Sequence, residues 1–65
     1  MFMIERLITR QWVFGEGRII EKLNRDGDWE YWFNNEFVFA VGPTHRFKVE
    51  GIVNLYDSGY FDYLT

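Results

Sequence analysis

Four turn signals divide this chain into short segments. The signals are Gly15-Glu16-Gly17, Asp26-Gly27, Asn34-Asn35 and Gly42-Pro43-Thr44. The segments between them are rich in aromatic and β-branched residues, a composition that is typical of strands. The predicted strands are residues 9–14, 18–24, 29–33, 37–41 and 46–56. Short strands joined by tight turns predict an antiparallel meander of five strands.

The chain is too small for two complete sheets, so the meander is expected to close on itself. It has 65 residues and no cysteine, and its aromatic residues, 22% of the chain, therefore have to supply most of the buried area. A flat sheet of this kind leaves one apolar face in water. We predict an all-β fold: a single small β-barrel domain over residues 1–65 that is SH3-like, with an OB-like barrel as the alternative.

The two ends of the chain are patterned less clearly. The apolar residues of 1–8 fit both helical spacing and strand alternation, and we favour a strand. Segment 46–56 alternates as a strand does, and its inward set is Phe47, Val49, Gly51, Val53 and Leu55. Gly51 is the expected site of a bend or bulge. Asp57 or Ser58 can cap a helix, so we expect a short helical turn in the C-terminal tail.

The length of the third turn decides which aromatic side chains share a face. Trp29, Tyr31 and Phe33 lie on one face of their strand. A two-residue turn pairs Phe33 with Glu36, whereas a three-residue loop, Asn34-Asn35-Glu36, pairs it with Phe37. We predict the three-residue loop, because it collects the apolar side chains of both strands on one side.

Trp32 is left on the opposite face, beside Val38 and Ala40. A tryptophan on a solvent-exposed face is typical of an anchor residue at a binding site for a partner. The alternative is that a terminal segment of the chain covers Trp32. We predict a protein-binding patch with Trp32 as the anchor and Val38 as its apolar floor. Further candidates for this patch are Trp12, Tyr60, Phe61 and Tyr63.

The basic residues of the strands suggest a second kind of surface. With aromatic side chains between them, they could bind single-stranded nucleic acid through stacking and phosphate contacts. The net charge of −3 disfavours this class, which we keep as the alternative. The candidate residues are Arg10, Arg18, Lys22, Arg46 and Lys48.

Sites for catalysis, metals or cofactors are not expected. His45 is the one histidine and lies in a turn, and paired carboxylates such as Asp26 and Asp28 are explained by turn formation. No apolar run approaches the roughly 20 residues that cross a membrane. We expect a cytoplasmic protein that binds no membrane.

These observations predict a non-enzymatic, aromatic-rich and acidic module that binds another protein. It would act as an adaptor, a regulator or a stoichiometric inhibitor, as small phage-type proteins do. A second copy of the chain is the other expected partner, because a two-fold dimer covers spare aromatic residues and free strand edges.

Overall fold

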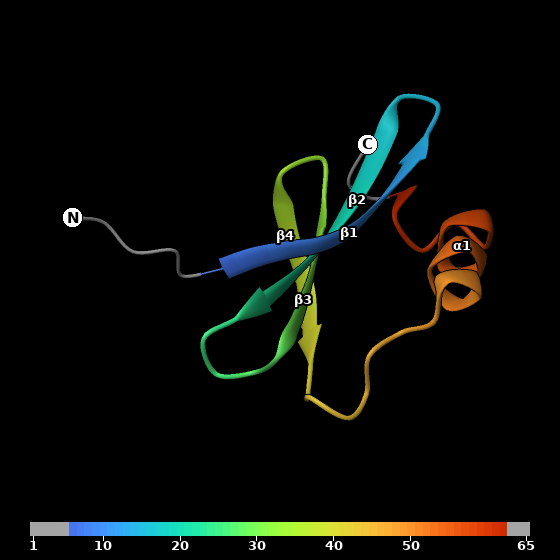
Figure 1. Cartoon of the computed structure of the whole chain (residues 1–65). Helices are drawn as coiled ribbons and strands as arrows, with labels where there is room; N and C mark the ends of the chain where they lie inside the picture. The colour runs from blue at the N-terminus through green and yellow to red at the C-terminus, as the bar shows by residue number, and fades with distance from the viewer. Residues whose placement is uncertain (1–5, 63–65) are drawn as a thin grey trace.

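The computed structural model describes residues 6–62, and the side chains of residues 8–62. Over this range the chain forms a four-stranded antiparallel sheet followed by a helix (Figure 1). The elements are β1 (Arg6–Phe14), β2 (Gly17–Asn24), β3 (Trp29–Phe33), β4 (Glu36–Val41) and α1 (Val49–Asp57), with the strands in the order β1-β2-β3-β4. The antiparallel meander is therefore confirmed for four strands. The strand predicted over residues 1–8 is confirmed from Arg6 onward, and residues 1–5 lie outside the described residues.

The predicted fifth strand is wrong, and within residues 6–62 the sheet is open and does not close into an SH3-like barrel. Residues 49–57 are helical instead. Ile52, Leu55 and Tyr56 have the i, i+3, i+4 spacing of one helix face; Ile52 is buried, and the other two pack against the core. Figure 1 shows α1 to one side of the sheet. The helix thus covers the apolar face that a barrel would have enclosed.

The C-terminal end of α1 has a Schellman motif. Gly59 has a φ of 87° and donates from its N–H to the carbonyl of Tyr56 at 3.1 Å, while Tyr60 donates to the carbonyl of Leu55 at 3.1 Å. Asp57 is the last residue of the helix, so its prediction as the cap of a later helical turn is wrong. The Ser58-Gly59 pair ends a helix here.

The third turn has two residues, so the predicted three-residue loop is wrong. Asn34 and Asn35 have φ angles of 49° and 71°, as a type I′ turn requires, and Phe33 pairs with Glu36. Asparagine adopts this left-handed conformation more readily than most residues, and Asn34 Oδ1 also accepts a hydrogen bond from the backbone N–H of Arg18 at 3.0 Å. The turn therefore follows the local preference of its two asparagines.

A β-bulge in β4 then restores most of the predicted arrangement. Trp32 pairs with Phe37 but Tyr31 pairs with Phe39, which leaves Val38 as the extra residue on β4. As a result Phe39 shares the face of Tyr31, and Val38 packs against the core. Of the aromatic residues predicted to share the face of Tyr31, only Phe37 lies on the opposite face.

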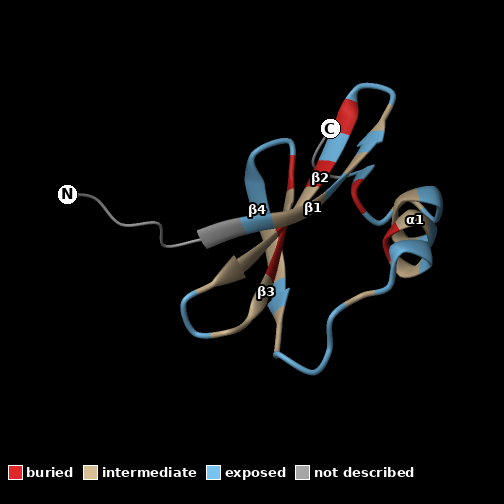
Figure 2. Ribbon diagram, viewed as in Figure 1, coloured by how far each residue is buried: buried red, intermediate tan, exposed pale blue. Residues whose placement is uncertain are grey.

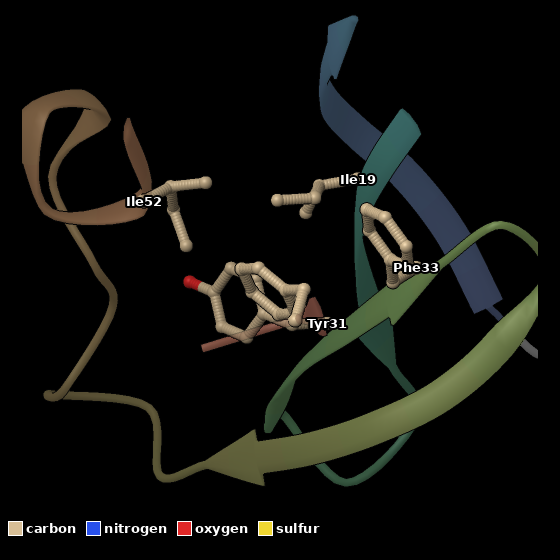
Figure 3. Packing of buried hydrophobic residues seen from close by; sticks show 5 residues of the cluster. Ile19, Tyr31, Phe33 and Ile52 are labelled. Atoms are coloured by element: carbon tan, nitrogen blue, oxygen red, sulfur yellow. The ribbon is translucent and has the colours of Figure 1, made fainter. Parts of the chain in front are cut away.

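The core lies between the sheet and α1, as Figure 3 shows for side chains from both. It consists of the buried residues Ile19, Tyr31, Phe33, Ile52 and Phe61. The ring of Phe61 stacks on Phe33 with centroids 5.3 Å apart. Buried positions accordingly fall on β2, β3 and α1, and on the segment after α1 (Figure 2).

Candidate functional site

The two faces of the sheet differ in what covers them. One face packs against α1 and the segment after it. In the part of the chain that the structure describes, no element packs on the other, which we call the open face. Its side chains alternate along the strands with those of the core. They are Ile8, Gln11, Val13, Arg18, Ile20, Lys22, Glu30, Trp32, Phe37 and Ala40.

Strand register arranges the open face in cross-strand rows. Neighbours within a row are partners on adjacent strands, so their side chains lie close enough to interact. The first row is Gln11, Ile20, Trp32 and Phe37. The second row is Ile8, Lys22, Glu30 and Ala40. A row that is apolar except for Gln11 thus lies beside a row that holds one cation and one carboxylate.

Several apolar side chains of the open face are exposed to solvent. The exposed fractions are 70% for Val13, 56% for Ile8 and 51% for Phe37. On the same face Ile20 and Trp32 are half-buried, and Phe37 is the cross-strand neighbour of Trp32, whereas Ile8 and Val13 lie on β1. A contiguous apolar area on one sheet face is typical of a binding surface, whereas scattered single residues are not.

Contacts on several sides hold the indole of Trp32 in place. Its ring meets Phe37 edge to face, with centroids 5.6 Å apart and an interplanar angle of 80°. The Nζ of Lys22 lies 4.1 Å from the ring centroid, and the indole Nε1 donates to Oε1 of Glu30 at 3.1 Å. An aromatic side chain that is already ordered loses little entropy when a partner covers it.

Glu30 is the acidic group of the open face, and it is 7% exposed. Its other oxygen, Oε2, accepts a hydrogen bond from Nδ2 of Asn24 at 3.0 Å. The exposed charge on this face therefore comes from Arg18, with Lys22 partly covered beside it. The open face is locally basic although the whole chain is acidic.

On the helix-covered face, Glu21 is the centre of a charged cluster and is 0% exposed. Arg10 donates to its Oε1 from Nε at 2.8 Å and forms an ion pair through Nη2 at 2.5 Å. Arg46 donates from Nη2 to Oε1 at 2.8 Å. Thr9 Oγ1 and Tyr31 Oη complete the set, each at 2.7 Å. A bulge at Thr9 in β1 lets both Thr9 and Arg10 reach the carboxylate.

These contacts determine the ionisation of the buried groups. Burial raises the pKa of Glu21, but the hydrogen bonds from Arg10, Arg46, Tyr31 and Thr9 outweigh it and lower this pKa from 4.5 to about 2. Burial, together with the hydrogen bond to Glu21, raises the pKa of Tyr31 from 10 to about 12. Glu21 therefore remains a carboxylate at neutral pH, and Tyr31 remains a neutral donor.

The Glu21 cluster holds the segment between β4 and α1 on the sheet. Arg10 also donates to the carbonyl of Phe47, and the N–H of Phe47 donates to Tyr31 Oη at 3.1 Å. Arg46 lies over the ring of Trp29, 4.2 Å from its centroid. Every member of the cluster has a partner within the chain. Its arrangement therefore explains structure and does not require a ligand.

The predicted protein-binding residues are not brought together. Trp32 lies on the open face as predicted. Val38 and Trp12 pack against the core on the other face, and Phe61 is buried within it, so none of these three can serve as a surface contact there. Tyr60 is exposed but lies against Phe61. Tyr63 lies outside the described residues.

The predicted nucleic-acid set is divided in the same way. Arg18 and Lys22 lie on the open face. Arg10 and Arg46 form ion pairs with Glu21 on the helix-covered face, and Lys48 is the N-cap position of α1. The basic residues therefore do not form one continuous surface.

Sequence reasoning missed several members of the open face, among them Phe37, Ile20 and Val13. Phe37 was missed because its face depends on the length of the third turn. The Asn34-Asn35 pair was the available signal, because asparagine tolerates the positive φ that both positions of a type I′ turn require. Ile20 and Val13 follow from alternation along β2 and β1 once the core positions Ile19 and Trp12 are known.

Hollows in the surface suggest no reaction chemistry. An apolar cavity of about 310 Å³ lies between β4 and α1, lined by Phe39, Val41, Phe47, Leu55 and Tyr60. A polar one of about 310 Å³ lies between two turns at one end of the sheet, lined by Glu16, Arg18, Ile20, Asn34 and Asn35. Among residues 6–62 no three side chains of the metal-ligating kinds gather into a candidate metal site. In the same range α1 is too short to cross a membrane.

Comparisons of the chain with protein-family models, with curated proteins and with solved structures found no match.

Proposed function

We propose that this protein is a non-enzymatic protein-binding module that docks its partner on the open face of its sheet. One observation carries the proposal: Val13, Ile8 and Phe37, all more than half exposed, lie with Trp32 on a sheet face that no described element covers. Apolar area of this kind favours association, because each partner removes the other's side chains from water.

Trp32 and Phe37 are the proposed anchors. Tryptophan is enriched among the residues that dominate binding energies, and buried aromatic rings contribute large contact areas. The contacts of Trp32 with Phe37, Lys22 and Glu30 order the indole before binding. Such a module acts by occupying a partner's surface, which suits an adaptor, a regulator or a stoichiometric inhibitor.

Binding of single-stranded nucleic acid is the alternative, and the cations around Trp32 argue for it. Arg18 and Lys22 could contact phosphates beside a stacked base. Two features argue against it. Lys22 lies over the face of the Trp32 ring, where a base would stack, and Arg10 and Arg46 are already paired with Glu21. A protein partner therefore fits the open face better.

The experiment compares the wild type with Phe37→Ser and with Val49→Ser. Phe37 and Val49 are exposed to a similar degree, 51% and 49%, but Val49 is on α1, away from the open face. Proteins captured from the native host's extract are purified, and their affinities for the three chains are measured by calorimetry. We expect Phe37→Ser to weaken binding by at least tenfold, about 1.4 kcal/mol, and Val49→Ser to leave it unchanged.

Trp32→Ala is the less informative variant, because it also removes the partners of Lys22 and Glu30 within the chain. A labelled single-stranded oligonucleotide at low salt tests the alternative. If Phe37→Ser binds every purified partner as tightly as the wild type, the open face is not the docking site. If only the oligonucleotide binds, and Phe37→Ser loses it, the nucleic-acid function replaces the protein-binding one.

A further inference from the structure

We infer that the open face binds a second copy of this chain, face to face, about a two-fold axis that runs parallel to the strands between β2 and β3. The inference rests on the proposed function, because it identifies the partner of the same surface. The two helices would then lie outside and the two sheets inside, so that each sheet has a layer on both of its faces.

A second sheet is a surface that fits the open face. Its helix-covered face is filled by the core, whereas its open face presents β-branched and aromatic side chains at strand positions. Two such faces pack about 10 Å apart with their strands nearly aligned, as in a β-sandwich. A second copy supplies such a face in matching size.

Strand order determines which residues meet. A two-fold axis between the two central strands places β1 over the partner's β4, and β2 over the partner's β3. Each cross-strand row then lies over the same row of the partner, read in the opposite direction. The geometry is approximate, because aligned sheets cross at about 30°.

The rows complement themselves under this operation. In the second row, Lys22 comes to lie over the partner's Glu30, and the same pair recurs on the other side of the axis. Ile8, a large residue at one end of this row, lies over the partner's Ala40, a small residue at the other end. Glu30 is 7% exposed and already accepts hydrogen bonds from Trp32 and Asn24, so the match of this row comes mainly from the unequal sizes of Ile8 and Ala40.

The first row behaves in the same way. Its central residue Ile20 lies over the partner's Trp32, so two indoles are buried close to the axis. At the ends of the row, Gln11 lies over the partner's Phe37. The largest apolar contacts therefore fall at the centre of the interface, where they contribute most.

The size of the face sets the expected affinity. Four strands about 4.8 Å apart and about five residues long, at roughly 3.3 Å per residue, outline a flat area of roughly 300 Å² per copy. Interdigitated side chains increase the buried area, which still falls below the range of stable interfaces and within that of weak, transient ones. We expect a dissociation constant on the order of 10 to 100 μM.

Sedimentation velocity from about 1 μM to about 1 mM, a range set to span that constant, tests the dimer. We expect the wild type and Val49→Ser to change from monomer to dimer over this range. Phe37→Ser and Lys22→Glu should weaken the dimer by at least tenfold, because symmetry places each substitution in the interface twice. Circular dichroism checks that each variant is folded.

Crosslinking tests the proposed orientation. The chain has no cysteine, so Ile8→Cys and Ala40→Cys each carry a single thiol. The two edge strands of one sheet are about 14 Å apart, and in this dimer position 8 lies over position 40 of the other copy. A short bismaleimide should therefore join the two variants when they are mixed, and should join neither variant to itself efficiently.

The outcomes separate the two proposals. A chain that stays monomeric at about 1 mM overturns the dimer, and the protein-binding function still stands if Phe37→Ser loses another purified partner. A dimer that Phe37→Ser and Lys22→Glu leave intact, or that crosslinks each thiol variant to itself, uses a different surface and also overturns the inference. Loss of the dimer in both variants, together with mixed crosslinks, supports it.

Discussion

Arg46 donates from Nη2 to Oε1 of the buried Glu21 at 2.8 Å, across 25 residues of sequence. Arg10 reaches the same carboxylate from β1, and Tyr31 reaches it from β3. One side chain on β2 therefore connects three strands to the segment that leads into α1. The position of the helix on the sheet depends on this carboxylate as well as on the apolar core.

Glu21→Gln should destabilise the fold strongly. Glutamine keeps the size of the side chain but removes its charge, and it places an N–H₂ donor among the donors of Arg10 and Arg46. Breaking a buried ion pair in this way costs about 3–5 kcal/mol. The free energy of unfolding of a domain of this size is roughly 3–10 kcal/mol. Urea unfolding followed by circular dichroism measures the loss.

The matched control is Glu16→Gln, which changes an exposed residue in the first turn. Its effect should stay within about 0.5 kcal/mol. If the Glu21 and Glu16 variants unfold at the same urea concentration, the cluster contributes no more to stability than a surface charge.

Stability should fall in acid. The pKa of Glu21 in the folded chain, about 2, lies below its ordinary value of 4.5. The Glu21 carboxylate therefore stabilises the fold fully above pH 4.5, and this contribution is lost as the pH falls toward 2. The shift corresponds to roughly 3 kcal/mol. Urea titrations at pH 7, 4.5, 3 and 2 follow the loss, and Glu21→Gln should lack this step. An equal stability at pH 7 and pH 2 would contradict the assignment.

Replacing Asn35 in the third turn by alanine or by glycine should have opposite effects on stability. Its φ of 71° is left-handed, which costs alanine about 1 kcal/mol and glycine nothing. Asn35→Ala should lower the melting temperature by about 4–8 °C, whereas Asn35→Gly, which gives the common Asn-Gly turn, should preserve or raise it. Identical melting curves for the two variants would show that the turn adopts another conformation in solution.

Gly17→Ala should strain the core. A Cβ at Gly17 would lie 3.0 Å from two ring atoms of Phe33, a buried residue with little room to move. Overpacking of this kind costs about 1–3 kcal/mol. A double-mutant cycle with Phe33→Leu checks the cause: the strain should be relieved in the double variant, with a coupling above about 1 kcal/mol. Additive effects would rule out the contact as the source.

The sheet was predictable because its signals are local. Alternation and turn residues predicted all four strands to within a few residues, and both depend on neighbours in sequence. The segment 46–56 carried two patterns at once. Its residues alternate as a strand does, and Ile52, Leu55 and Tyr56 also form a helix face. The Ser58-Gly59 stop signal favoured the helix, but the choice is made by the apolar sheet face that needs covering.

The candidate site was predictable only in part. Trp32 was expected on the face opposite the core, and it lies there. Its partner Phe37 was missed because the third turn is one residue shorter than predicted and a bulge at Val38 follows it. The Glu21 cluster was also missed, since a glutamate within a strand gives no sign that two arginines far along the chain will reach it.

The bulge at Val38 also has a consequence for how this chain can vary in length. Val38 has no partner on β3, so deleting it would leave a regular hairpin in which Trp32 still pairs with Phe37, and Tyr31 with Phe39. Each ring would keep its side of the sheet, and the core would lose only the packing of Val38. The hairpin can therefore lose one residue at this position during evolution without moving the side chains of one sheet face to the other.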